Sequence, residues 1–164
     1  MALSNRDRVG RGFEFLAEGL APFVNARMTA AVSEGADWIS IMEAREQTKN
    51  GGAKKFAVND PGFLLRVITE DWRVFKDHLS RVEQSFASEL RDVRNRWAHN
   101  DSFSGDDTYR ALDTMERLLT AVGAPDQVDE VRQLRLDHQK AAFESDTKKR
   151  VKQQESAVTV SGAG

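Results

Sequence analysis

Residues 89–100 contain the side chains best suited to chemistry, in the order Glu-Leu-Arg-Asp-Val-Arg-Asn-Arg-Trp-Ala-His-Asn. A histidine exchanges protons near neutral pH, and an arginine guanidinium presents a planar set of donors to phosphate oxygens. Arg94, Asn95 and His99, called here the Arg–Asn–His motif, are therefore candidates for proton transfer beside a bound oxyanion. Asn95 and His99 are four residues apart and share a helical face, with Arg91 four residues earlier on that face.

Arg94 and His99 do not share a face on an ideal helix, because five residues at 100° each place them about 140° apart. They meet only if the helix ends near His99, or if a second copy of the chain brings its own motif close. The polar sequence Asn100-Asp101-Ser102 predicts such a helix end.

The spacing between arginine and histidine is not specific by itself, because each of the three histidines follows an arginine at a similar distance. Only Arg94 is followed by asparagine, and only His99 lies where a predicted helix gives way to a polar loop. We therefore expect His78 and His138 to be ordinary surface or boundary residues.

Structural explanations of the same residues stay open. His99 could cap a helix C-terminus, where the helix dipole favours a cation. Arg91, Arg94 and Arg96 could form a solvated face that pairs with neighbouring carboxylates. An acidic segment after His99 could pair with these arginines or begin the next helix. This segment contains Asp101, Asp106 and Asp107.

The elements that must position these side chains are predicted to be helices. Apolar residues recur every three or four positions along four stretches, and strand-like alternation is scarce. The stretches are residues 9–20, 64–79, 82–97 and 112–122. The chain is therefore predicted to be all-α, an antiparallel helical bundle with extra short helices.

Turn and capping residues indicate where these helices begin and end. Asp60-Pro61 is expected to start one helix, Ser104 to cap the start of another, and Gly123 to follow the end of the 112–122 stretch. Residues 48–59 contain two adjacent glycines and two adjacent lysines and are expected to form a loop between helices.

The length of 164 residues fits one domain, residues 1–136, followed by a polar tail or linker at residues 137–164 that we expect to be partly disordered. The absence of cysteine excludes disulfides, thiolate nucleophiles and cysteine-ligated metal sites. No phosphate-binding loop, zinc-protease or serine-elbow motif occurs, so we expect no cofactor and no metal ion.

Charge and hydropathy limit the partners of the chain. The formal net charge is -2, which restricts any nucleic-acid site to a local basic patch. No apolar run approaches the length of a bilayer span, and the N-terminal residues lack the apolar segment of a secretory signal. We therefore expect a cytoplasmic protein with no membrane contact.

The Arg–Asn–His motif resembles that of the HEPN superfamily (higher eukaryotes and prokaryotes nucleotide-binding), which consists of arginine, a polar residue that is often asparagine, a few residues, and histidine. The surrounding residues resemble one subgroup, named for a yeast RNA quality-control endoribonuclease. The resembling residues are Asp60-Pro61, Leu64-Leu65, Trp72, Phe75, the motif itself and Tyr109-Arg110-Ala111-Leu112-Asp113. The resemblance covers roughly residues 5 to 135.

The resemblance implies a HEPN-like helical bundle that acts as a metal-independent endoribonuclease or binds RNA. In such an enzyme the 2′-OH of RNA attacks the adjacent phosphate and leaves a 2′,3′-cyclic phosphate end. His99 would then be the acid or base, Arg94 the phosphate clamp, and Asn95 a group that orients His99 or holds a phosphate oxygen. Arg91 and Arg96 would contact RNA.

The resemblance also implies partners. Family members usually build the site across a two-fold homodimer, and bacterial domains of this subgroup precede large ATPases and helicases, many of them linked to phage defence. The alternative is a non-catalytic module that mediates dimerisation or docks an ATPase or helicase.

Overall fold

Helices account for all the regular structure of residues 3–162, which are the residues described in this computed structural model; side chains are described up to residue 157. The prediction of an all-α bundle is therefore confirmed. The seven helices are α1 (Asn5–Ala31), α2 (Trp38–Asn50), α3 (Pro61–Glu70), α4 (Trp72–Phe75), α5 (Arg81–Ala98), α6 (Gly105–Ala121) and α7 (Pro125–Gly162).

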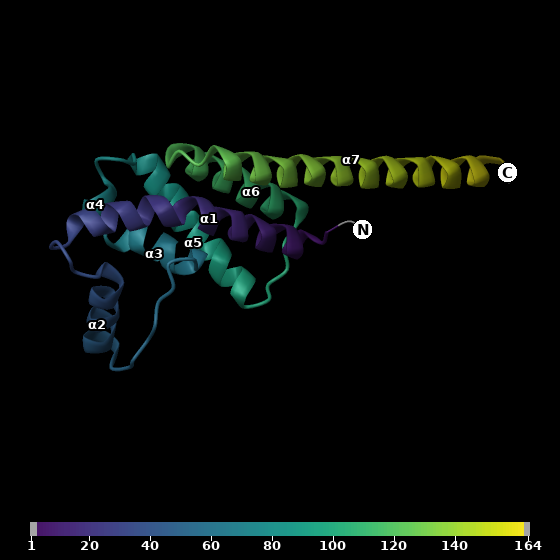
Figure 1. Ribbon diagram of the computed structural model, residues 1–164. Coiled ribbons are helices and arrows are strands. Elements are labelled where there is room, and N and C mark those ends of the chain that lie inside the picture. Colours follow the sequence, from purple (N-terminus) through teal and green to yellow (C-terminus); the bar gives the residue numbers. More distant parts are fainter. Residues whose placement is uncertain (1–2, 163–164) are drawn as a thin grey trace.

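Helix α1 is the central element of the bundle. It packs against α3, α6 and α7, while α5 packs against α3 and α6 (Figure 1). The core stripe of α1 follows the predicted three- and four-residue spacing. Its buried members are Val9, Phe13, Leu16, Leu20 and Val24. This stripe anchors both the α3–α5 pair, which holds the motif, and the α6–α7 hairpin.

Two glycines allow α1 to lie close to α6. A Cβ atom on Gly12 would lie 2.7 Å from Met115 Sδ, and a Cβ atom on Gly19 would overlap the side chain of Leu119. Both glycines are therefore required for the close approach of the two helix backbones, which buries Leu112, Met115 and Leu119 completely.

The predicted capping residues are confirmed. The Asp60 carboxylate accepts a hydrogen bond from the Gly62 N–H (3.2 Å) at the start of α3, and the Ser104 hydroxyl accepts one from the Asp107 N–H (3.0 Å) at the start of α6. Gly123 adopts a φ of 75° after α6, a conformation that glycine adopts without steric cost.

Replacing Ser104 with alanine is expected to lower the free energy of unfolding by about 1 kcal/mol, because the Asp107 N–H loses its acceptor at the first turn of α6. Chemical denaturation would measure this loss. Ser102→Ala is the control, since the Ser102 side chain makes no hydrogen bond among the described residues. Equal stability of the two variants would contradict the capping role.

The apolar stripe over residues 64–79 was expected to form one helix, but the structure divides it into two. Helix α3 ends at Glu70, and α4 contains only four residues. The break lies at Asp71, whose φ and ψ of −103° and 40° leave the helical region. Its buried carboxylate is held by Arg45 of α2 at 3.3 Å, so a tertiary contact that periodicity does not encode accompanies the turn.

Helix α7 continues through residue 136 as far as Gly162, as one helix that extends beyond the bundle (Figure 1). The apolar stripe fades there, but the alanine, glutamate, lysine and glutamine residues are strong helix formers. The division of the chain at residue 136 stays a prediction, and residues 163–164 lie outside the described residues.

Candidate functional site

The Arg–Asn–His motif lies on the last turn of α5 and the residue that follows it. Helix α5 ends at Ala98, and His99 is its C-cap residue, with its N–H bonded to the Asn95 carbonyl at 3.0 Å. Asn100 then adopts a φ of 60°, in the left-handed region that asparagine tolerates well. The predicted helix end at His99 is therefore confirmed.

Arg6 of α1 makes side-chain contacts with the C-terminal end of α5. Its Nη2 donates to the Trp97 carbonyl (2.9 Å) and to Asn100 Oδ1 (2.7 Å), and its guanidinium lies 4.4 Å from the centre of the Trp97 ring. The Trp97 indole N–H donates to the Arg6 carbonyl at 3.1 Å in return. These contacts hold the backbone on both sides of His99.

Replacing Arg6 with glutamine is expected to speed hydrogen exchange at the His99 amide by roughly fivefold, because two hydrogen bonds that hold its neighbours are lost. Arg11→Gln is the matched control, since Arg11 contacts Glu14 and the Phe15 ring within α1 and makes no hydrogen bond or ion pair with the end of α5 among the described residues. Exchange measured by NMR tests the prediction. Equal protection in the two variants would show that Arg6 does not hold this segment.

Arg94 lies between two hollows of the surface. The larger, called here the apolar groove, has a volume of about 680 Å³ and is lined mainly by α1 with Pro61, Arg94 and Trp97. The guanidinium of Arg94 lies 5.4 Å from the centre of the Trp97 ring, and its Nη2 is 3.8 Å from Asp60 Oδ1. Arg94 is thus partly buried and only loosely paired.

The smaller hollow, called here the basic pocket, has a volume of about 270 Å³. Its cationic and amide side chains are Lys54, Lys55, Arg66, Arg91, Arg94 and Asn95. Two of the three motif residues therefore share one concave surface with four further cations.

His99 lies apart from both hollows. Its side chain is exposed, and among residues 3–157 it makes no hydrogen bond or ion pair. Arg94 lines both hollows and His99 lines neither of them.

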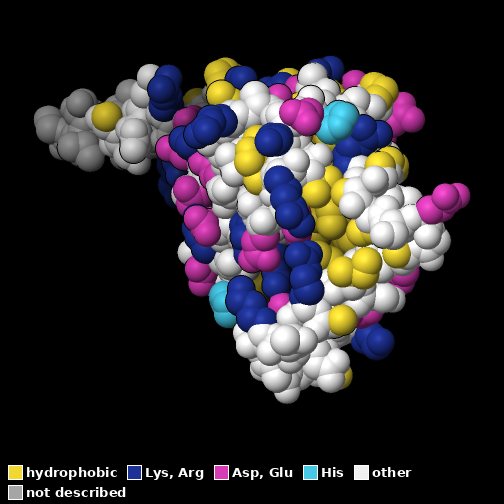
Figure 2. Space-filling model, turned by 90° about the vertical axis from the view of Figure 1, so that its left-hand side faces the viewer, with side chains coloured by type: hydrophobic (Ala, Val, Ile, Leu, Met, Phe, Trp, Pro, Cys, Tyr) yellow, Lys and Arg dark blue, Asp and Glu magenta, His cyan; other side chains and the backbone are white. Residues whose placement is uncertain are grey.

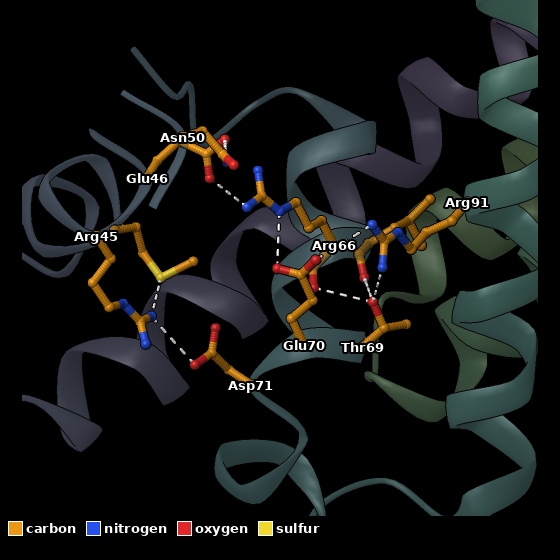
Figure 3. A network of polar contacts seen from close by, with 10 residues as sticks. Arg45, Glu46, Asn50, Arg66, Thr69, Glu70, Asp71 and Arg91 are labelled. Atoms are coloured by element: carbon orange, nitrogen blue, oxygen red, sulfur yellow. Dashed lines mark hydrogen bonds and ion pairs between the residues drawn. The ribbon is translucent and has the colours of Figure 1, made fainter. Parts of the chain in front are cut away.

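The two arginines expected to contact RNA have different surroundings. Arg91 Nη1 donates to the Thr69 hydroxyl at 2.9 Å, and its Nη2 lies 3.6 Å from Glu70 Oε1 (Figure 3). Arg96 instead turns towards the acidic segment, with Nη2 at 3.3 Å from Asp107 Oδ2. Hydrogen bonding from Arg96 lowers the pKa of the Asp107 carboxyl.

The acidic segment therefore has the structural roles that were left open for it. Asp107 and, at 3.9 Å, Asp101 pair with Arg96, and Asp106 lies with Asp107 in the first turn of α6, where the helix dipole favours carboxylates. These contacts neutralise part of the negative charge beside His99.

The other two histidines differ from one another. His78 is exposed, as predicted, and its Nε2 lies 3.0 Å from Arg27 Nη1. His138 is buried, against expectation: its Nε2 lies 2.9 Å from the Gly105 carbonyl, which can only accept, so Nε2 carries the proton. This contact also shows that packing against α6 reaches beyond residue 136.

Sequence reasoning missed Lys54, Lys55 and Arg66 as members of a site. The two lysines follow Gly51-Gly52 in the expected loop, and Arg66 lies on α3, so no spacing rule joins them to the motif. The adjacent lysines in a glycine-containing loop were the only sequence feature that pointed to a basic site.

The face on which α2 and α4 lie carries a band of Lys and Arg side chains mixed with acidic ones, beside a hydrophobic patch (Figure 2).

Within residues 3–162, no helix carries an apolar stretch long enough to span a bilayer, and no group of three or more His, Asp or Glu side chains is arranged to hold a metal ion.

Residues 11–123, more than half of the chain, match the family model described as Swt1-like HEPN. The matched range includes the whole of the Arg–Asn–His motif and every residue of the basic pocket. None of the curated proteins and none of the solved structures matches the chain.

Proposed function

Since the chain belongs to the Swt1-like HEPN family, we propose that it is a metal-independent endoribonuclease whose site contains Arg94, Asn95 and His99. The observation that carries this proposal is the exposure and surroundings of the three motif side chains. The His99 side chain is exposed, and its imidazole makes no hydrogen bond or ion pair within the described residues. Arg94 and Asn95 line a concave basic surface near the same end of α5. A histidine that only stabilised the fold would be expected to engage a neighbour, as His138 does.

The chemistry requires a base, an acid and a stabiliser of negative charge. A neutral imidazole accepts the proton of the RNA 2′-OH, whose oxygen forms a bond to the adjacent phosphorus. An imidazolium then donates a proton to the departing 5′-oxygen as the P–O5′ bond breaks. Arg94 binds the phosphorane oxygens, and Asn95 orients His99 or holds a further oxygen. The products carry a 2′,3′-cyclic phosphate and a 5′-OH.

We place the complete site in a homodimer. His99 lines neither of the hollows that Arg94 lines, which supports a two-fold partner that brings the histidine of one chain to the arginine of the other. Arg91 and Arg96 would contact RNA outside the reacting phosphate. Attachment to an ATPase or helicase, a role in phage defence and a cytoplasmic location belong to the same proposal.

Cleavage of a labelled mixed-sequence RNA in EDTA tests the proposal. The expected result is cleavage by the wild-type chain, with fragments that end in a 2′,3′-cyclic phosphate. Mass measurement of the same sample in solution is expected to give a dimer. Cleavage that appears only after Mg²⁺ is added, or fragments with 3′-OH ends, would contradict the proposal.

A second candidate is a non-catalytic module that dimerises or docks an ATPase or helicase. The apolar groove favours it, because Leu3, Phe13, Pro61 and Trp97 line an open surface beside Arg94. Apolar hollows of this size are common docking sites. A folded, dimeric wild-type chain that leaves RNA intact would favour this second function for the isolated domain.

A further inference from the structure

We propose that the basic pocket binds a backbone phosphate of the RNA, next to the phosphate on which the Arg–Asn–His motif acts. The inference rests on the proposed function, because Arg94 and Asn95 belong both to the motif and to the pocket. It adds a binding site formed by Lys54 and Lys55 of the α2–α3 loop, with Asp60 as a built-in competitor of the phosphate.

The inner cations of the pocket are already neutralised. Arg66 pairs with Glu46 at 2.7 Å and with Glu70 at 2.9 Å (Figure 3). Hydrogen bonds from Arg66 and then Asn50 lower the pKa of the Glu46 carboxyl, so this pair stays ionised at neutral pH. Arg91 is held by Thr69. These contacts link α2 to α3 and α3 to α5 along the inner wall of the pocket.

The outer cations are weakly engaged. Arg94 Nη2 lies 3.8 Å from Asp60 Oδ1, and Lys55 Nζ lies 4.0 Å from Glu43 Oε1, with 91% of the Lys55 side chain exposed. The Lys54 ammonium lies 5.8 Å from the centre of the Phe56 ring. Ion pairs at distances near 4 Å contribute little, so an arriving phosphate competes with them at low cost.

The loop that carries the two lysines is anchored. The Phe56 ring stacks on Phe63 at 4.6 Å with an interplanar angle of 9°, and Phe63 stacks on Trp38 at 5.7 Å. The Phe56 N–H also donates to the Glu43 carboxylate at 3.0 Å. Lys54 and Lys55 are thus held at the rim of the pocket by the residue that follows them, which lowers the ordering cost of binding.

Asp60 occupies the position that a phosphate oxygen would take. Its carboxylate accepts from the Gly62 N–H at the start of α3 and faces Arg94, so it uses both the helix N-terminus and the guanidinium. Because asparagine caps a helix as well as aspartate does, Asp60→Asn removes the competing charge and keeps the cap.

The first test measures RNA binding by the full chain with His99→Ala added, so that the RNA stays intact, by anisotropy of labelled single-stranded RNA in EDTA. Asp60→Asn is expected to tighten the dissociation constant about threefold. Asp37→Asn is the matched control, since Asp37 is the N-cap of α2, accepts from the Ile39 N–H and lies outside the pocket. Equal effects of both variants would overturn the inference.

The second test removes the lysines. Lys54→Gln with Lys55→Gln is expected to weaken binding about tenfold and to lower the slope of log affinity against log salt by about 1.4, since each phosphate contact to a single strand contributes about 0.7. Lys148→Gln with Lys149→Gln on the exposed part of α7 makes the same charge change. Equal weakening by both pairs would overturn the inference.

The two proposals fail in different ways. If the wild-type chain cuts RNA while the Asp60 and lysine variants behave like their controls, the phosphate site is wrong and the endoribonuclease stands. If these variants change RNA binding as expected while no protein cuts RNA, the phosphate site stands and the catalytic proposal is wrong.

Discussion

Replacing His99 with alanine is expected to lower the rate of RNA cleavage in EDTA by about a hundredfold or more, because general acid–base catalysis contributes about 10²–10⁴ to such rates. Arg94→Ala is expected to cause a loss of about 10²–10³, since it removes a charged donor from the transition state. His78→Ala is the control, because His78 is an exposed histidine whose ring contacts Arg27. The rate of appearance of cyclic-phosphate fragments measures all three.

The stability of His99→Ala is expected to stay within about 0.5 kcal/mol of the wild type, since the His99 side chain is exposed and makes no hydrogen bond or ion pair within the described residues. Cleavage by His99→Ala at the wild-type rate would show that the activity comes from another residue or another protein. A loss of activity in His78→Ala equal to that in His99→Ala would show that the assay reports stability.

Mixing the two inactive variants tests the two-fold site. If Arg94 of one copy works with His99 of the other, a dimer of Arg94→Ala with His99→Ala contains one complete site. Exchange of subunits is then expected to restore about a quarter of the wild-type rate. If both groups act within one chain, no complete site forms and the mixture stays inactive.

Replacing Leu112 with alanine is expected to lower the free energy of unfolding by about 3 kcal/mol, because Leu112 is completely buried where α6 meets Gly12 of α1 and its loss leaves a cavity. The melting temperature is expected to fall by about 9 °C in a chain of this size. Thermal unfolding followed by circular dichroism measures the change.

Leu136→Ala is the matched control, since it removes the same atoms from a helix at a position that is 46% exposed. It is expected to change stability by less than about 0.5 kcal/mol. Similar melting temperatures for the two variants would contradict the packing of α1 against α6 around Leu112.

The helical class and several helix ends depend on local physics, so the sequence predicts them well. Leu112, Met115 and Leu119 lie on one helical face whatever the partner, and Asp60 and Ser104 cap helices by bonding N–H groups two or three residues away. The motif was recognisable for the same reason, since Arg94, Asn95 and His99 lie within one turn and its cap.

The features of the fold that local sequence patterns predict wrongly depend on contacts between residues distant in sequence. The 64–79 stripe is interrupted at Asp71, whose carboxylate is held by Arg45, and His138 is buried against Gly105, which lies 33 residues away. The apolar stripe fades after residue 136, yet α7 continues there through residues of high helix propensity.

The sequence by itself therefore determined the all-α class, the capped ends of α3 and α6, and the family through its motif, because each depends on neighbours within a few residues or on a recognisable string. Only the tertiary structure decided which side chains share a surface. It placed Lys54, Lys55 and Arg66 beside Arg94 and Asn95, and it left His99 apart from them. Charges separated by up to 40 residues, from Lys54 to Arg94, meet only when α3 packs on α5, and that packing is a property of the whole bundle.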